Sequence, residues 1–144
     1  MIRELDLAET GLGYAAMRQL RGDLAGEAEF VHAVNEVQRA EGYRLVGSFE
    51  EGEEQAIAVA GFRCGQNLAW GRHLYVDDLV TMAQARGRGH GRALLDWLAA
   101  EARRLGCGQM HLDSGVGLER ADAHRLYLGS GMVISAHHFA RRVS

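Results

Sequence analysis

The chain has 144 residues, of which 47% are hydrophobic and 24% are charged, and it carries a formal net charge of -3. These values are ordinary for a globular protein and exclude the compositions of disordered and fibrous chains. The slightly acidic balance argues against non-specific binding to nucleic acid or to an anionic membrane, because both require a basic surface. We therefore expect a single domain over residues 1–144, with neither a nucleic acid nor a membrane as partner.

The amino terminus has charges where a secretory signal needs an apolar stretch, and no apolar run approaches the length of a membrane span. Cys64 and Cys107 lack the short paired spacing of a zinc site, and two cysteines are too few for a disulfide scaffold. Proline is absent and glycine occurs 19 times, so glycines should mark most boundaries between elements. The sequence therefore favours a cytoplasmic protein with reduced cysteines.

The first part of the chain has the pattern of one strand followed by two helices. Residues Met1 to Leu7 alternate between apolar and polar side chains, as in a strand. A four-residue apolar spacing from Leu12 to Leu24 predicts a first helix. Apolar positions from Phe30 to Val37 predict a second helix, which should end at Gly42 because glycine tolerates the left-handed backbone of helix ends.

From Tyr43 onward the apolar period changes to two, which indicates strands. Residues 43 to 49 alternate as in a half-buried strand, and the acidic run Glu50–Glu54 predicts a solvated turn. Gln55 to Cys64 and His73 to Met82 predict two further strands. Together these segments predict an antiparallel meander.

The strongest helical pattern covers Gly89 to Leu105, and Gly106 should end this helix. A strand, a helix and one or two closing strands are expected after it, at Gln109 to Ser114, Leu118 to Leu128 and Met132 to Arg141. The predicted class is α+β (mixed α/β), in the order β-α-α-β-β-β-α-β-α-β(-β). The sheet should be mixed and largely antiparallel, with helices on both faces.

A segment rich in glycine and arginine joins the strand near Met82 to the helix near Gly89, with the sequence Gln84-Ala85-Arg86-Gly87-Arg88-Gly89-His90-Gly91-Arg92. Glycines let the backbone approach a ligand, and the first turn of a helix offers N–H groups that favour negative charge. Arginines add bidentate contacts to phosphate. The segment has no Gly-Lys-Ser/Thr end, and Arg92 stands where a dinucleotide fingerprint needs glycine, so both of these nucleotide-binding motifs are excluded.

The stretch Arg86 to Gly91 closely resembles the acyl-CoA loop of the GNAT N-acetyltransferase superfamily, which has the pattern Gln/Arg-x-x-Gly-x-Gly/Ala. Residues 84–89 also fit this pattern. The register Arg86 to Gly91 places the last glycine directly before the apolar part of the helix, as the family usually does, and we prefer it.

A second stretch, Ala123 to Met132, resembles the family's signature Ala-x-x-Phe-Tyr, which is followed after three residues by Gly-Phe. Leu126 and Met132 are conservative departures from it. Many members carry asparagine three residues before the alanine, where this chain has Arg120. Whether Arg120 replaces the contact that the asparagine makes with the cofactor stays open.

The resemblance implies a GNAT-like fold and an acyl-CoA-dependent N-acetyltransferase. The acetyl group of acetyl-CoA would pass by direct attack to a primary amine of a small molecule or of a protein or peptide. A backbone N–H of the strand before the loop would polarise the thioester carbonyl. The residues expected to bind acetyl-CoA are Leu79, Val80, Thr81, Arg86, Gly87, Arg88, Gly89, His90, Gly91 and Arg92.

Amine acetylation needs a neutral nucleophile, whereas an alkylammonium has a pKa of ~10.4, so a base or a water relay must remove a proton. Asp77 and Asp78 are the candidates, and we expect only one to face the thioester because adjacent strand residues point to opposite faces. The acidic pair would also suit a cationic substrate, as in some polyamine-type members. Tyr127 is the candidate acid that protonates the leaving thiolate.

A non-catalytic acyl-CoA-binding or regulatory module on the same fold is the alternative, because a fold does not establish an activity. His137 and His138 are neighbours that would point apart on a strand, so no metal site is expected. The sequence is compatible with a homodimer and leaves the oligomeric state and the acceptor open.

Overall fold

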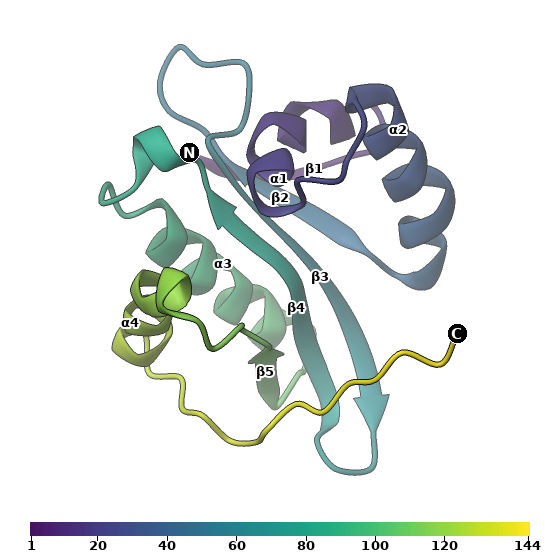
Figure 1. Ribbon diagram of the computed structural model, residues 1–144, viewed down its shortest axis with the longest axis vertical. Coiled ribbons are helices and arrows are strands. Elements are labelled where there is room, and N and C mark those ends of the chain that lie inside the picture. Colours follow the sequence, from purple (N-terminus) through teal and green to yellow (C-terminus); the bar gives the residue numbers. More distant parts are fainter. The chain divides into compact units, whose positions relative to one another are not determined.

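The computed structural model describes residues 1–144 and divides into two compact units, residues 1–112 and residues 113–144. The first unit contains a five-stranded sheet in the order β1-β2-β3-β4-β5 (Figure 1). Strands β1 to β4 are antiparallel neighbours, and β5 runs parallel to β4. The bounds are Ile2–Leu5 for β1, Arg44–Ser48 for β2, Ala58–Asn67 for β3, Gly71–Thr81 for β4 and Gln109–Leu112 for β5. The predicted mixed, largely antiparallel sheet is confirmed.

Four α-helices are present, three in the first unit and α4 in the second. They are α1 (Tyr14–Leu20), α2 (Glu27–His32), α3 (His90–Arg104) and α4 (Ala121–Gly129). Helix α2 continues through a π-helical stretch, η2, and a 3₁₀ turn, η3, which cover Ala33–Gln38 and Arg39–Glu41. Three further 3₁₀ turns are η1 (Thr10–Gly13), η4 (Ala83–Ala85) and η5 (Leu118–Arg120). None of the helices combines the length and the hydropathy that a membrane crossing requires.

Glycines end two of these helical segments, as the sequence predicts. Gly42 has φ of 90° and follows η3, and Gly106 has φ of 74° just beyond α3. Such left-handed backbone is easily adopted only by glycine. The first helix is shorter than its apolar spacing suggests, because α1 ends at Leu20 and Leu24 lies outside it.

The sheet of the first unit is covered on both faces, by α1 and α2 on one side and by α3 on the other (Figure 1). Leu45 of β2 belongs to the core under α1 and α2. Its neighbour Val46 points to the opposite face, which α3 contacts, and both residues are fully buried. The prediction that this strand is half-buried is therefore wrong. Alternation in the sequence separates two faces, but it does not say that only one of them is covered.

The second unit contains η5 and α4, and residues 132–144 have no regular secondary structure. The predicted closing strand at Met132 to Arg141 is therefore wrong. Apolar side chains of this segment are exposed, among them Val133, Ile134 and Phe139. Alternating apolar residues form a strand only where another strand accepts their backbone hydrogen bonds, and periodicity does not identify that partner.

A charged network fixes α3 to the sheet. Glu101 of α3 is buried and accepts hydrogen bonds from Arg104, which lies one turn further along α3, and from Arg44 of β2. Arg44 also pairs with Glu4 of β1. The hydrogen bonds from Arg104 and then Arg44 lower the pKa of Glu101 from its ordinary value of 4.5 to about 2. The charged form of Glu101 therefore favours the folded state.

We expect Glu101→Gln to destabilise the protein by about 1–3 kcal/mol at neutral pH, because Arg44 and Arg104 lose a charged acceptor. In the wild type, the contribution of Glu101 is present above pH 4.5 and is lost as the pH falls toward about 2. Urea unfolding between these two pH values should therefore show a flatter pH dependence for the variant. Asp96→Asn, which removes an exposed pair with Arg92 on the same helix, is the control and should change the free energy of unfolding little. Equal pH dependence in wild type and Glu101→Gln would contradict this account.

Candidate functional site

A β-bulge in β4 positions the two candidate acids. Gly61 of β3 pairs with Asp78, and the next residue of β3, Phe62, pairs with Val76, so Asp77 is the extra residue of the bulge. Bulges re-aim side chains relative to regular strand alternation. Asp77 and Asp78 consequently line the same cavity. The expectation that these neighbours point to opposite faces is wrong, because it assumed a regular strand.

The cavity that both aspartates line, called the β4 pocket below, has a volume of about 300 Å³. One part of its wall is apolar and comes from α1, from α2 and from the segments that follow them. This part consists of Met17, Leu24, Phe30, Ala33 and Val34. The polar part consists of Arg21, Gln38, Tyr43, Arg63, Asp77 and Asp78. The pocket therefore combines apolar surface with charges of both signs.

Asp78 is bound on both carboxylate oxygens. Arg21 donates to its Oδ1 from Nε at 2.9 Å and from Nη2 at 2.7 Å, and the Tyr43 hydroxyl donates to Oδ2 at 2.8 Å. Burial, followed by the negative charge of Asp78, raises the pKa of Tyr43 well above its ordinary value. The phenol therefore stays protonated and acts as a donor. A Cβ atom at Gly61 would lie 1.8 Å from the Tyr43 hydroxyl oxygen, so this approach requires glycine at that position.

Asp77 is bound on one carboxylate oxygen only. Its Oδ2 accepts a hydrogen bond from Arg63 Nε at 2.6 Å, and Oδ1 accepts none. The other two nitrogens of Arg63 donate to Glu41 and Gln38. Asp77 therefore has an oxygen that can accept a further hydrogen bond, while the charges of Asp77 and Asp78 are balanced by two guanidinium groups.

Beyond the bulge, β4 has an open edge. Strand β5 pairs with β4 only from His73 to Val76, so residues 77–81 have no strand neighbour on that side. On the other side, Met82 donates to the carbonyl oxygen of Ile57 at 2.9 Å. Since hydrogen-bonded and non-hydrogen-bonded pairs alternate in antiparallel strands, the N–H groups of Leu79 and Thr81 point away from β3. Of the three predicted strand residues, these two thus present N–H groups at the open edge.

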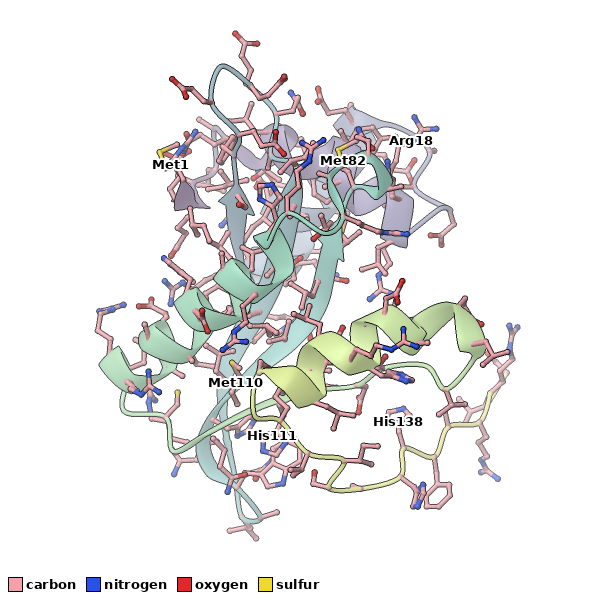
Figure 2. The ribbon with its side chains drawn as sticks, turned by 90° about the vertical axis from the view of Figure 1, so that its left-hand side faces the viewer. Met1, Arg18, Met82, Met110, His111 and His138 are labelled. Atoms are coloured by element: carbon pink, nitrogen blue, oxygen red, sulfur yellow. The ribbon has the colours of Figure 1, made fainter.

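The open edge leads through η4 into the glycine-rich loop. Figure 2 labels Met82 at the end of β4 and Arg18 of α1; the two elements meet here, since Gln19 Oε1 accepts a hydrogen bond from Ala83 N at 2.8 Å. Gly87 and Gly89 have φ of 82° and 88°, which requires glycine. Helix α3 begins directly after them, so the N–H groups of its first turn border the loop. This arrangement suits an anionic group.

Arg88 and His90 of the loop share an acidic partner that sequence reasoning placed in a solvated turn. Arg88 Nη1 lies 2.6 and 2.9 Å from the two carboxylate oxygens of Glu50. His90 Nε2 lies 3.0 Å from Glu50 Oε1, and its Nδ1 lies 2.8 Å from Ser48 Oγ. The hydrogen bond with His90, followed by that with Arg88, lowers the pKa of Glu50. Arg86 is exposed, and its side chain makes no hydrogen bond or ion pair.

Tyr127, the candidate acid, lies on α4 in the second unit, whereas Asp77, Asp78 and the loop lie in the first. Its side chain is buried, and burial raises the pKa of the phenol above its ordinary value of 10.0, although Arg120 opposes this effect. The phenol is therefore protonated at neutral pH and can donate a proton. Arg120 stands where the resembled family commonly has asparagine, and it partly offsets the rise in the pKa of Tyr127 that burial causes.

Several residues of the site were not singled out from the sequence. Arg21 and Arg63 neutralise the aspartates, Tyr43 donates to Asp78, and Glu50 binds the loop. Of these residues, only Tyr43 could have been identified from the sequence, because a tyrosine on the buried side of a strand needs a hydrogen-bond partner. In the whole chain, no three or more His, Cys, Asp or Glu side chains are arranged to hold a metal ion.

Comparison with known proteins gives consistent matches. Residues 14–132 match the model of the Acetyltransferase (GNAT) family. The chain is 34% identical over 131 residues to the uncharacterized N-acetyltransferase YhdJ of Bacillus subtilis (strain 168), and the match covers 90% of this chain and 89% of YhdJ.

Solved structures also share the fold. Glucosamine-6-phosphate N-acetyltransferase from Arabidopsis thaliana superposes with a TM-score of 0.76 at 19% identity, covering 100% of this chain and 98% of that one. Ribosomal-protein-alanine N-acetyltransferase from Brucella melitensis biovar Abortus 2308 superposes with a TM-score of 0.82 at 17% identity, covering 99% of both chains. At these identities the likeness concerns the fold alone.

Proposed function

The chain belongs to the Acetyltransferase (GNAT) family, and we propose that it transfers an acetyl group from acetyl-CoA to the primary amine of a small molecule. The observation that carries this proposal is the open edge of β4 at residues 77–81, which leads directly into the glycine-rich loop at the start of α3. The pantetheine arm of CoA is extended and carries amide groups, so it can hydrogen-bond to such an edge as an added strand does. The pyrophosphate at the end of this arm would then lie at Gly87, Gly89 and the first turn of α3.

The residues of the site can divide the proton transfers between them. Asp77 Oδ1 is a free acceptor for the amine proton, directly or through water, whereas both oxygens of Asp78 are occupied. An N–H of Leu79 or Thr81 would donate to the thioester carbonyl oxygen. As the N–C bond forms and the C–S bond breaks, Tyr127 would give its proton to the leaving sulfur. In this proposal Asp77 acts on the amine and Asp78 holds Tyr43 and Arg21 in place.

The test is release of the CoA thiol. The protein is incubated with acetyl-CoA and a broad panel of primary amines, and free thiol is followed with a chromogenic reagent. We expect release that depends on both the enzyme and the amine, together with the matching N-acetylated product. Tight binding of CoA without turnover on any amine would instead support a non-catalytic acyl-CoA-binding module.

Glu50 competes with a phosphate for Arg88, because its carboxylate already binds both Arg88 and His90. Glu50→Gln should therefore strengthen CoA binding, by about two- to fivefold in Kd, the range expected for an exposed ion pair. Calorimetric titration with CoA measures this change. Glu51→Gln removes the same charge from the same exposed turn without an ion pair to Arg88 and is the matched control. Equal effects of both variants, or weaker binding in Glu50→Gln, would contradict the competition.

A further inference from the structure

Two polar atoms of the β4 pocket have opposite character and no partner. Arg21 uses Nε and Nη2 to bind Asp78 and the backbone oxygen of Asp77, and its Nη1 donates no hydrogen bond. Asp77 uses Oδ2 to bind Arg63, and its Oδ1 accepts no hydrogen bond. The remaining guanidinium and carboxylate atoms of the polar wall are occupied by Tyr43, Glu41 and Gln38 or by one another. The pocket thus offers a ligand one cationic donor and one anionic acceptor.

The guanidinium group with the free donor contacts the residue that has the free acceptor. Arg21 Nη2 lies 3.1 Å from the backbone oxygen of Asp77, so its guanidinium group is beside the residue whose Oδ1 is free. A ligand that binds both must have its own positive and negative groups separated by only a few bonds. Among the residues that line the pocket, Arg21 and Arg63 balance the charges of the two aspartates, so the lining lacks the excess negative charge that favours a polyamine. Glu41, which shares Arg63, is exposed and lies outside this lining.

The rest of the pocket is suited to a small apolar group. Phe30 and Val34 are almost fully buried and lie with Met17 in the core that the pocket borders. A volume of about 300 Å³ is at the small end of the range found for ligand pockets, roughly 300–1,000 Å³. It suits a single small molecule better than a polypeptide segment.

We infer that the acceptor is a free amino acid, or a zwitterion of the same kind, with an apolar side chain. This inference rests on the proposed acetyl transfer and specifies its substrate class. The ammonium group binds Asp77 Oδ1, the carboxylate binds Arg21 Nη1, and the side chain packs against Phe30 and Val34. The amine is then held beside Leu79, whose N–H points to the open edge of β4.

The experiment compares four acceptors in the thiol-release assay: L-leucine, leucine methyl ester, isoamylamine and spermidine. The ester and isoamylamine keep the amine and the apolar group of leucine but lack its carboxylate. Loss of the carboxylate removes its charged hydrogen bond with Arg21. The kcat/KM for isoamylamine should therefore be about 10- to 100-fold lower than that for leucine. A preference for isoamylamine or for spermidine over leucine would overturn the inference.

The variant Arg21→Gln tests whether Arg21 causes the preference for leucine. The variant should lower kcat/KM for leucine about 10- to 100-fold more than kcat/KM for isoamylamine, so that the two acceptors become similar. Arg18→Gln changes an exposed arginine of α1, three residues before Arg21 and outside the pocket, and is the matched control that should keep the preference for leucine (Figure 2). An equal loss with both acceptors in Arg21→Gln would assign Arg21 a structural role and overturn the inference. Absence of thiol release with every amine in the wild type would instead contradict the proposed function itself.

Discussion

Replacement of Tyr127 by phenylalanine is expected to lower kcat about 10²- to 10⁴-fold, the usual contribution of a positioned acid. The hydroxyl is the only group removed, and the pKa of the phenol is raised by burial, so the wild-type side chain holds its proton at neutral pH. Affinity for CoA, measured by calorimetry, should stay the same, because the predicted binding residues lie on β4 and in the glycine-rich loop. Initial rates at saturating acetyl-CoA and amine give the change in kcat.

Tyr14→Phe is the control for this prediction. Tyr14 is half-buried beside Phe30, makes no hydrogen bond through its hydroxyl, and belongs to α1. Its removal should leave kcat nearly unchanged, and thermal unfolding of both variants checks that each is folded. Full turnover in Tyr127→Phe would remove Tyr127 from the acid role and indicate that solvent protonates the leaving sulfur.

Removal of both Arg86 and Arg88 should weaken CoA binding strongly. Each guanidinium can make a charge-assisted hydrogen bond to pyrophosphate, and such bonds contribute about 1.5–3 kcal/mol. Because Arg88 must first leave Glu50, we expect the lower part of this range, so that the double alanine variant raises Kd about 10- to 100-fold. Calorimetric titration with CoA at fixed ionic strength measures the change.

S-acetylpantetheine is a control substrate that has the thioester and the extended arm of acetyl-CoA but no pyrophosphate. It shows whether the double variant loses only the pyrophosphate contact or loses activity in general. Its kcat/KM should be nearly the same in the wild type and in the double variant. Arg103→Ala, near the opposite end of α3, changes the net charge without touching the loop and should keep wild-type affinity for CoA. Unchanged CoA binding in the double variant would rule out the loop as the pyrophosphate site.

The loop and α3 could be predicted from the sequence because their determinants are local. Gly89 and Gly106 mark the two ends of α3, and Leu94, Leu95 and Leu98 are buried as their spacing predicts. The predicted strands of the meander are present as β2, β3 and β4 with shifted ends. Periodicity and glycine positions depend on the backbone of each segment alone, so a single sequence can show them.

The bulge and the charge pairs of the β4 pocket could not be predicted in this way. The bulge at Asp77 depends on how β3 and β4 pair, and a shift of one residue in register changes which face a side chain takes. Arg21, which directly follows α1, reaches Asp78 across 57 residues of sequence, and Arg63 of β3 reaches Asp77 across 14. No local pattern shows which arginine meets which carboxylate, so the sequence identified the acids but not their partners.

The central claim, direct transfer of acetyl from CoA to an amine at this site, is tested most directly by initial rates with both substrates varied. CoA thiol and N-acetylated amine are quantified in the same samples. The account predicts equal amounts of the two products and intersecting double-reciprocal lines, because both substrates must be bound together. Parallel lines accompanied by an acetylated protein would indicate a covalent intermediate and contradict direct attack.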